Sequence, residues 1–289
     1  MPDQSGSFAN KTAIITGGGS GIGRAMGEHL ALAGAHVVLA DIDCEAVEGA
    51  ATQIRATLPA AGSVEGRWLD VRDRDAVQSL VDEVRTRHSA LDFMFNNAGI
   101  SMGGPTHEFT GEHWDRIIDV NVRGVVNGVV AAYPCMIEQG HGHIVNTASG
   151  AGLVPPPLVV AYGTTKHAVV GLSTGLRPEA ALHGVRVSAL CPGAVDTAIL
   201  DRLPDADLPA TASAPVTPRD YLAKMRQRPI DVDRFARLAL RAVLRNKALI
   251  VVPRSAKSLW YLQRMSPALV ERISRSMARM VTKDLVRPA

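Results

Sequence analysis

The chain has 289 residues, of which 46% are hydrophobic and 20% are charged, and its formal net charge is +3. This length and apolar content are enough for one sizeable hydrophobic core, and no continuous apolar run approaches the length of a membrane-spanning helix. The three cysteines, Cys44, Cys135 and Cys191, are widely spaced and odd in number, which argues against a disulfide framework and suits a reducing compartment. Because the first residues also lack the basic and apolar regions of a signal peptide, we expect a cytoplasmic protein.

Segments of strand and helix character alternate along the chain. The expected strands are 12–16, 36–40, 64–69, 92–96, 143–147, 185–190 and 248–252. The expected helices are 21–33, 44–57, 73–87, 115–138, 161–182 and 231–245. Several strands are continuous apolar runs, as in a parallel sheet that helices cover on both faces. The sequence therefore predicts an α/β fold, a doubly wound parallel sheet of about seven strands in a single domain over residues 1–253.

The first expected strand leads into a turn with glycines at positions 17, 18, 19, 21 and 23, and apolar residues then recur at helical spacing. Strand, glycine turn and helix together form a dinucleotide-binding arrangement, because glycine permits unusual φ angles and a close approach to the pyrophosphate, and the helix N-terminus offers free N–H groups. We interpret these residues as cofactor-binding: Gly17, Ser20, Gly21, Ile22 and Gly23. The spacing Gly17-x-x-x-Gly21-x-Gly23 departs from the literal Gly-x-Gly-x-x-Gly pattern, and an ordinary flexible turn is the alternative.

Asp41 ends the next apolar run and lies eighteen residues after Gly23. A carboxylate at this place accepts hydrogen bonds from the adenosine ribose hydroxyls and repels a 2′-phosphate. Neither Ser20 nor Ile42 offers the cation that such a phosphate requires. This favours NAD over NADP as cofactor, unless Asp41 only caps a loop.

Tyr162 and Lys166 are four residues apart, and Ser149 stands thirteen residues before the tyrosine. Residues at this spacing share a helix face. The positive charge of a lysine favours the phenolate, which lowers the pKa of the phenol from near 10 toward the working range of a proton carrier. A serine hydroxyl can hold the substrate oxygen that the tyrosine protonates. Alone, this spacing is also typical of solvated helix faces.

With these features in place, residues 8 to 252 resemble the short-chain dehydrogenase/reductase family, which has a Rossmann-type fold. The matching segments occur in family order: Thr16-Gly-Gly-Gly-Ser-Gly-Ile-Gly23, Asp70-Val71, Asn96-Asn97-Ala98-Gly99, Asn121-Val122, Ser149, Tyr162-x-x-x-Lys166 and Pro192-Gly193, with Thr197 four residues further on.

The resemblance implies a catalytic tetrad of Asn121, Ser149, Tyr162 and Lys166, in which the asparagine holds a water beside the lysine. It places Asp70 and Val71 at the adenine. It also implies cofactor contacts by residues of two further segments: Asn97, Ala98 and Gly99 after the fourth strand, and Pro192, Gly193, Val195 and Thr197 at the nicotinamide carboxamide. Asn97 and Asn121 could instead satisfy backbone groups.

We therefore expect an NAD-dependent alcohol dehydrogenase or carbonyl reductase that moves a hydride between the nicotinamide and a secondary alcohol or ketone. The stiff apolar stretch 152–160 before Tyr162 suggests a lipophilic substrate, steroid-like or fatty. A 3-oxoacyl thioester reductase is an alternative that Asp41 argues against, because such reductases mostly use NADPH. A non-catalytic sensor or scaffold that binds the cofactor is the alternative from another class.

A proline late in one helix, a proline-rich segment and a pair of histidines complete the sequence analysis of residues 1–253. Pro178, late in the helix of Tyr162, predicts a kink or an early end. The proline-rich segment 198–229 corresponds to the substrate lid of the resembled family, and its apolar residues could line a pocket: Leu200, Leu203, Leu208 and Val216. No metal site is expected, and we interpret His141 and His143 as turn residues before a strand.

Residues 254–289 form a basic extension. They carry eight basic and two acidic residues, a net charge of +6, which leaves −3 for residues 1–253. Two apolar sets fall at helical spacing: Leu259, Leu262 and Met265, and then Leu269, Ile273, Met277 and Met280. A helix pair packed on the enzyme or a neighbouring subunit is one interpretation, and contact with an anionic membrane surface is another. Nucleic acid is disfavoured because no aromatic residues interleave the charges.

The helices 115–138 and 161–182 are apolar on more than one face, with Val125, Val129 and Ala132 beside Val122, Val126 and Val130. Such helices require partners on two sides. One side meets the sheet, and in the resembled family the other meets a second subunit. We therefore expect a homotetramer or a homodimer.

Overall fold

A computed structural model of the chain describes residues 8–58, 62–202, 207–213, 217–225, 227–253 and 255–285. Its centre is a parallel sheet with strand order β3-β2-β1-β4-β5-β6-β7. The strands are β1 Thr12–Thr16, β2 His36–Asp41, β3 Ser63–Trp68, β4 Phe93–Asn96, β5 Gly142–Thr147, β6 Val185–Pro192 and β7 Leu249–Val252. The predicted doubly wound sheet of seven strands is confirmed, with strand bounds within two residues of those expected.

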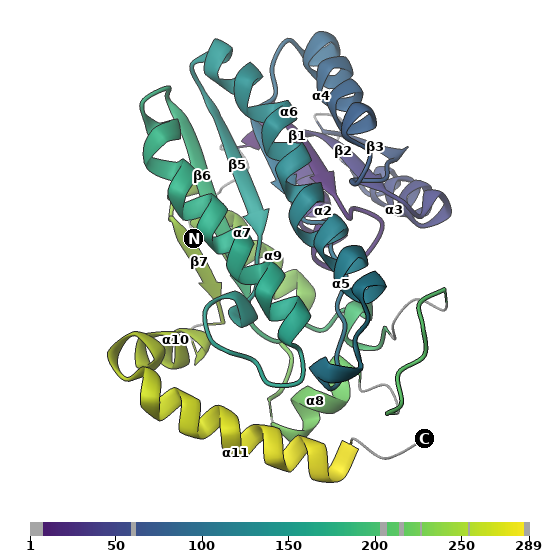
Figure 1. Cartoon of the computed structure of the whole chain (residues 1–289). Coiled ribbons are helices and arrows are strands. Elements are labelled where there is room, and N and C mark those ends of the chain that lie inside the picture. The colour runs from purple at the N-terminus through teal and green to yellow at the C-terminus, as the bar shows by residue number, and fades with distance from the viewer. Residues whose placement is uncertain are drawn as a thin grey trace.

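Helices cover both faces of this sheet (Figure 1). One face carries α2 Gly21–Leu32, α3 Cys44–Arg55 and α9 Val232–Leu244, and the other carries α4 Arg74–His88, α6 Gly124–Gln139 and α7 Val160–Ala181. Successive residues of a strand point to opposite faces. Thus Ala13 and Ile15 belong to the core beneath α2 and α9, whereas Ile14 belongs to the core beneath α4 and α6.

The expected helix 115–138 begins earlier and is irregular. It consists of α5 Gly111–Ile118, a π-helical turn over Asp119–Arg123, and α6. Thr110 and His113 form a capping box at its start, which explains why the helix begins before the apolar periodicity does. The π turn holds Asn121 and displaces it from the regular helical register.

Two other local expectations need correction. Helix α7 runs to Ala181, three residues beyond Pro178, so the early end does not occur, and a kink at this proline stays a prediction. His143 is not a turn residue but the second residue of β5, where it is buried and hydrogen-bonded to Ser188. Burial lowers the pKa of His143 to about 3, so this side chain is neutral and structural.

The helical stretch Gly111–Gln139 is long and apolar enough to cross a membrane by length and composition, among the residues that the structure describes. A core helix passes the same test, and 56% of the most apolar window of this stretch is buried inside the protein. Val125, Val129 and Ala132 of α6 are buried, whereas Val130 on the other face is 51% exposed. The two apolar faces predicted for this helix are therefore present.

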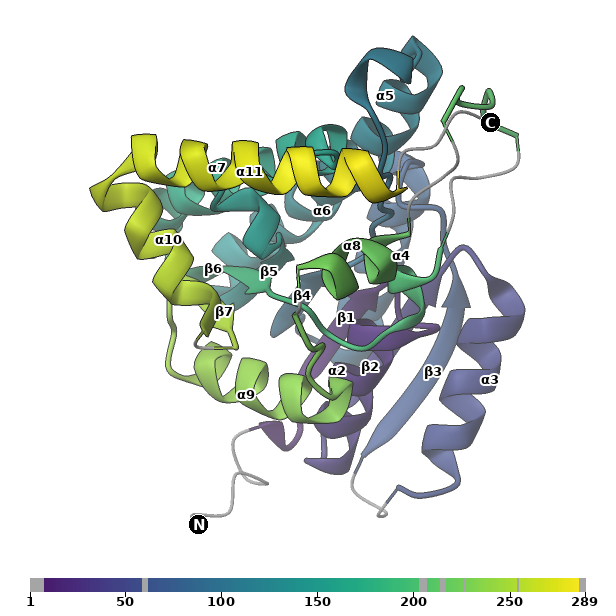
Figure 2. The same ribbon diagram turned by 90° about the horizontal axis from the view of Figure 1, so that it is seen from below.

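The C-terminal region is helical, as expected. Helices α10 Ser255–Met265 and α11 Pro267–Leu285 form a hairpin, and α11 crosses the end of the molecule at which the strands terminate (Figures 1 and 2). Between β6 and α9 lies a short helix that the sequence did not indicate, α8 Pro218–Lys224, and α11 contacts it. Leu203 and Val216 of the predicted lid lie outside the described residues.

Candidate active site

The carboxyl ends of the strands bring the predicted site residues together. Because all seven strands are parallel, the loops after β1, β2, β3, β4, β5 and β6 leave the sheet at the same edge. A cavity of about 1080 Å³ opens there. It is lined by all of the predicted site residues except Gly23 and Asn121, namely Gly17, Ser20, Gly21, Ile22, Asp41, Asp70, Val71, Asn97, Ala98, Gly99, Ser149, Tyr162, Lys166, Pro192, Gly193, Val195 and Thr197.

The glycine turn between β1 and α2 is shaped for a close backbone approach. Gly17 and Gly21 have φ angles of +65° and +52°, which other residues rarely adopt. A Cβ atom on Gly23 would lie 2.1 Å from the carbonyl oxygen of Gly17, so Gly23 lies behind the cavity because it must pack against the turn. Helix α2 has no acidic residue in its first turn, and Ser20 makes no side-chain cap. The N-terminus of α2 is therefore suited to an anion such as a pyrophosphate.

Asp41 at the end of β2 is held in a defined position. Its Oδ2 accepts a hydrogen bond of 2.9 Å from the backbone N–H of Gly19, and its Oδ1 accepts one of 3.1 Å from that of Asp43. The carboxylate therefore faces the glycine turn at the cavity wall. Both contacts are to backbone N–H groups, as in the loop cap considered from the sequence, and acceptance of hydrogen bonds from the ribose hydroxyls stays a prediction.

Two arginines that line the cavity were missed by the sequence reasoning. Arg72 and Arg116 line the cavity, and Arg72 forms an ion pair of 2.6 Å with Asp70. Hydrogen bonding from Arg72 lowers the pKa of Asp70, so this carboxylate is ionised. Arg116 pairs with Asp207 of the lid at 2.6 Å. Neither arginine belongs to the matching segments, so only the fold brings them to the site.

Asn97 braces the loops around the cavity. Its Nδ2 donates to the carbonyl oxygens of Thr16 and Gly17 at 3.1 and 3.3 Å, and its Oδ1 accepts from the hydroxyl of Thr147 at 3.2 Å. The side chain of Asn97 thus ties the ends of β1 and β5 to the loop after β4. The contacts of the Asn97 side chain are thus those of the alternative considered from the sequence, in which it satisfies backbone groups.

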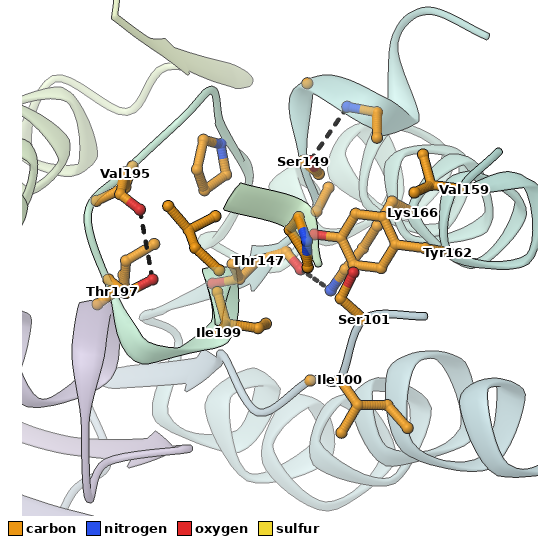
Figure 3. A pocket seen from close by; sticks show the side chains of 18 of the residues that line it. Ile100, Ser101, Thr147, Ser149, Val159, Tyr162, Lys166, Val195, Thr197 and Ile199 are labelled. Carbon is orange, nitrogen blue, oxygen red and sulfur yellow. Dashed lines mark hydrogen bonds between the residues drawn. The ribbon is translucent and has the colours of Figure 1, made fainter. Parts of the chain in front are cut away.

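The proton-transfer group lies where α7 meets the end of β5. Figure 3 shows Tyr162, Ser149 and Lys166 around one space, with Lys166 bonded to the carbonyl oxygen of Thr147 at 3.0 Å. The Nζ of Lys166 lies 5.6 Å from the centre of the Tyr162 ring. Ser149 follows β5, and its Oγ accepts a hydrogen bond of 3.1 Å from the N–H of Ala151. The three side chains face the same part of the cavity.

The electrostatics differ from the simple expectation that Lys166 lowers the pKa of the phenol. Burial raises the pKa of Tyr162, and hydrogen bonding to Ser149 opposes this rise. Burial also lowers the pKa of Lys166 to about 8, so the lysine holds its charge less firmly than in water. In the chain alone the pKa of the phenol therefore lies above its usual value, so any stabilisation of the phenolate by the charge of Lys166 is smaller than the effect of burial.

Asn121 lies behind the cavity and is fully buried. Its Oδ1 accepts from the N–H of Ile100 at 2.8 Å, and its Nδ2 donates to the carbonyl of Ile100 and to the hydroxyl of Thr165. A Cβ atom on Gly99 would lie 3.1 Å from this Oδ1 and 3.2 Å from the Nζ of Lys166, so Gly99 is wedged between the two side chains. The side chain of Asn121 is thus hydrogen-bonded to the backbone of Ile100 and to the hydroxyl of Thr165, and the water-holding role remains a prediction.

The segment after β6 closes the other wall of the cavity. The N–H of Gly193 donates to the carbonyl of Val252, and Val195 is buried beside Ile230. Thr197 donates to the carbonyl of Val195 (Figure 3), and its Cγ2 would lie 3.2 Å from a Cβ atom on Gly21. Thr197 therefore spans from this wall to the glycine turn.

Helix α11 forms a roof over the cavity. The sequence predicted that this extension could pack on the enzyme but did not indicate where. Val270, Ile273, Ser274 and Met277 line the cavity, and Ser274 donates to the carbonyl of Pro155 in the wall before α7 at 3.2 Å. The predicted stripe is therefore only partly correct. Val270 and Val281 are the buried residues of α11, whereas Leu269 and Met280 are 43% and 44% exposed, because the packed face is displaced by about one residue.

No group of three or more His, Cys, Asp or Glu side chains that could hold a metal occurs in the part of the chain that the structure describes. The cavity instead combines a glycine turn at a helix N-terminus, an acidic residue after the second strand and a Ser–Tyr–Lys group. Together the fold and this site define a dinucleotide-binding oxidoreductase.

Comparison with known proteins gives the family. The model of the short chain dehydrogenase family matches residues 11–207. The levodione reductase of Leifsonia aquatica is 37% identical over 195 residues, which is 67% of this chain and 73% of the relative. The 2,5-dichloro-2,5-cyclohexadiene-1,4-diol dehydrogenase of Sphingobium indicum is 42% identical over 210 residues, 72% of this chain and 80% of the relative. The chain therefore belongs to the short-chain dehydrogenase family.

Solved structures agree with this assignment. A short-chain dehydrogenase/reductase from Burkholderia phymatum in complex with NAD matches 91% of this chain and 95% of its own, with a TM-score of 0.81 and 34% identity. A short-chain dehydrogenase from Sphingobium yanoikuyae in complex with NADPH covers the same shares, with a TM-score of 0.72 and 25% identity. A nicotinamide cofactor of either kind is thus found within this fold.

Proposed function

We propose that the protein is an NAD(H)-dependent dehydrogenase or reductase that moves a hydride between the nicotinamide and the carbon of a lipophilic secondary alcohol or ketone. The convergence of Ser149, Tyr162 and Lys166 in the cavity that also holds the glycine turn carries this proposal. A bound nicotinamide cofactor supplies or accepts the hydride. The residues of the chain bind and orient the two reactants and move the proton.

In this proposal Tyr162 is the general acid and base. Its raised pKa keeps the phenol protonated at neutral pH, so it is ready to donate a proton to a carbonyl oxygen during reduction. Alcohol oxidation requires the phenolate and is therefore favoured at alkaline pH. Ser149 donates a hydrogen bond to the reacting oxygen, and Lys166, anchored on Thr147, stabilises the phenolate by its charge and binds the nicotinamide ribose.

The preference for NAD is proposed from Asp41. Its carboxylate is fixed against the glycine turn by Gly19, so it cannot turn away without losing that hydrogen bond. A 2′-phosphate would bring a second negative charge to the same place. Arg72 lies nearby but is paired with Asp70. Because the Sphingobium yanoikuyae dehydrogenase was solved in complex with NADPH, the assay below compares both cofactors directly.

The lipophilic substrate is proposed from the roof and wall of the cavity. Val154, Pro155 and Pro156 form the wall before Tyr162, while Ile273 and Met277 face it from α11. A substrate bound between them buries apolar surface, which stabilises the complex by about 25 cal/mol per Å². The relatives named for a levodione and for a chlorinated cyclohexadienediol act on compact cyclic substrates by name, which is compatible with ring-shaped alcohols and ketones.

The test is a panel of secondary alcohols and ketones of increasing size, assayed with NAD(H) and NADP(H) by the absorbance of the reduced nicotinamide. We expect turnover with NAD(H) that increases with the apolar area of the substrate. Binding of NAD without turnover of any alcohol or ketone would favour a cofactor-bound sensor. Turnover confined to 3-oxoacyl thioesters would favour the alternative reductase.

We also propose a cytoplasmic homo-oligomer that pairs through α6 and α7. Val130 of α6 is 51% exposed, and the hydroxyl of Tyr133 on the same helix is buried without a hydrogen-bond partner. An apolar helix face of this kind is covered by another subunit in many dimers.

A further inference from the structure

The C-terminal hairpin has a second apolar face that points away from the enzyme. The inner face of α11 holds Val270 and Val281, both almost fully buried, and Met277 over the cavity. Leu269 and Met280 lie on a different side of the helix and are exposed. Since residues 269 and 280 are eleven apart, about three turns, they fall on one line along the helix.

The hairpin carries a large share of the exposed large hydrophobic residues in the described part of the chain. Twelve large hydrophobic residues are exposed in the described part of the chain, and five of them lie on the hairpin: Tyr261, Met265, Leu269, Ile273 and Met280. Met265, in the bend between the two helices, is 84% exposed. Such a concentration of large apolar side chains marks an interaction site more often than a chance distribution.

Cations flank the apolar line. Arg272, Arg279 and Lys283 are exposed on α11 and share one side of the helix by their spacing of seven and four. That side is adjacent to the line of Leu269 and Met280, because positions three apart are neighbours on a helix surface. Glu271 forms an ion pair of 2.6 Å with Arg275, so its negative charge is compensated within the helix. The face is thus apolar and strongly positive, whereas residues 1–253 carry a net charge of −3 in the total of +3.

We propose that the outer face of α10 and α11, with Tyr261, Met265, Leu269 and Met280 at its centre and Arg272, Arg279 and Lys283 beside them, docks on an anionic lipid surface. Apolar side chains that enter the headgroup region beside a row of cations are the chemistry of an interfacial helix. A second copy of the chain fits less well, because a symmetric contact would join two copies of the same positively charged face. The hairpin also lies at the outer edge of the molecule, where a flat surface can reach it (Figures 1 and 2).

The position of this face relates docking to the cavity. Ile273 lines the cavity and is also 37% exposed, so the apolar line reaches the cavity roof. A lipophilic molecule held in the lipid would meet the cavity without crossing water. This consequence rests on the proposed function, but the docking itself does not.

The experiment is sedimentation of the full chain with vesicles of phosphatidylcholine alone or mixed with phosphatidylglycerol. We expect binding to the mixed vesicles only, and release by 0.5 M salt, because the Debye length falls from about 10 Å at 0.1 M toward 3 Å at 1 M. The variants Leu269→Ser/Met280→Ser and Arg272→Gln/Arg279→Gln should each weaken binding at least tenfold. The matched control Leu32→Ser/Leu238→Ser alters two side chains of similar exposure, 40% and 39%, on α2 and α9, and should bind like the wild type.

Turnover of a water-soluble alcohol and the mass by light scattering are measured for each variant. Unchanged turnover together with lost vesicle binding supports the proposal, because neither altered pair lines the cavity. Equal binding by the wild type and both hairpin variants would overturn it, as would the absence of binding to anionic vesicles at low salt. A fall in oligomer mass on Leu269→Ser/Met280→Ser would also overturn it, because this face would then be a subunit contact. Loss of all turnover in the wild type would count against the proposed function and leave the vesicle result valid.

Discussion

Met277 and Met280 of α11 offer a comparison of one residue type in two environments. Met277 lines the cavity, whereas Met280, about one turn further along the helix, does not line it and is 44% exposed. If α11 forms the roof of the substrate site, Met277→Ala should impair turnover of large lipophilic substrates, and Met280→Ala should not. Assays without lipid keep the proposed docking face out of the comparison.

The size of the effect follows from the surface removed. Methionine exceeds alanine by three heavy atoms, and at about 0.8 kcal/mol per buried group their full contribution is roughly 2.4 kcal/mol. Met277 is only partly buried and a substrate covers only one side of it, so we expect about 1.4 kcal/mol, or a tenfold fall in kcat/KM. A small substrate that does not reach the roof should lose less than twofold.

The assay is kcat/KM with NAD(H) for a graded series of secondary alcohols, together with thermal unfolding of both variants. The slope of log kcat/KM against substrate size should flatten in Met277→Ala and stay unchanged in Met280→Ala. An equal loss for small and large substrates would mean that Met277 acts through the fold. An equal loss in both variants would refute the assignment of the roof.

Further outcomes are expected for Asp41, for Tyr162, for Lys166 and for the assembly. The wild type should prefer NAD(H) over NADP(H) by at least tenfold in kcat/KM, about 1.4 kcal/mol, and Asp41→Ala should reduce this preference. Comparable efficiency of the wild type with both cofactors would contradict the role of this carboxylate. Tyr162→Phe should retain the fold and NAD binding but lose roughly a hundredfold or more in kcat, and near-normal turnover in the folded variant would remove the phenol from the mechanism. Lys166→Ala should move the alkaline optimum of alcohol oxidation upward, and Lys166→Met should raise the thermal midpoint at pH 7. The pKa of Lys166 is about 8 in the folded chain and 10.5 in the unfolded chain, so the wild type gains stability as the pH rises between these values. The rise in thermal midpoint caused by Lys166→Met should therefore become smaller from pH 8 upward. A lower thermal midpoint for Lys166→Met at pH 7 would show that the hydrogen bond to Thr147 outweighs the cost of burial. Light scattering at micromolar concentration should give a dimer or a tetramer, and a monomeric mass would be evidence against pairing through α6 and α7.

Much of the fold was determined by local patterns. Continuous apolar runs such as 185–190 indicated strands buried on both faces, and the glycines at 17, 21 and 23 indicated the turn into α2. These features depend on φ angles, periodicity and steric space within a few residues, so they can be inferred without neighbours in space. The parallel order then placed the ends of the strands, and hence the predicted site residues, at one edge of the sheet.

The tertiary structure decided what depends on distant residues. Only the folding of the chain brings Arg72 and Arg116 to the cavity, and the hydrogen-bond partners of the Asn121 side chain are the distant residues Ile100 and Thr165. The raised pKa of Tyr162 follows from burial, which no spacing of four residues expresses. Both sides of α11 carry apolar residues, so periodicity alone could not choose between Leu269 and Val270 as the packed residue. Contacts with distant parts of the chain fix the rotation of α11, namely those with α8, with α10 and with Pro155 in the wall of the cavity.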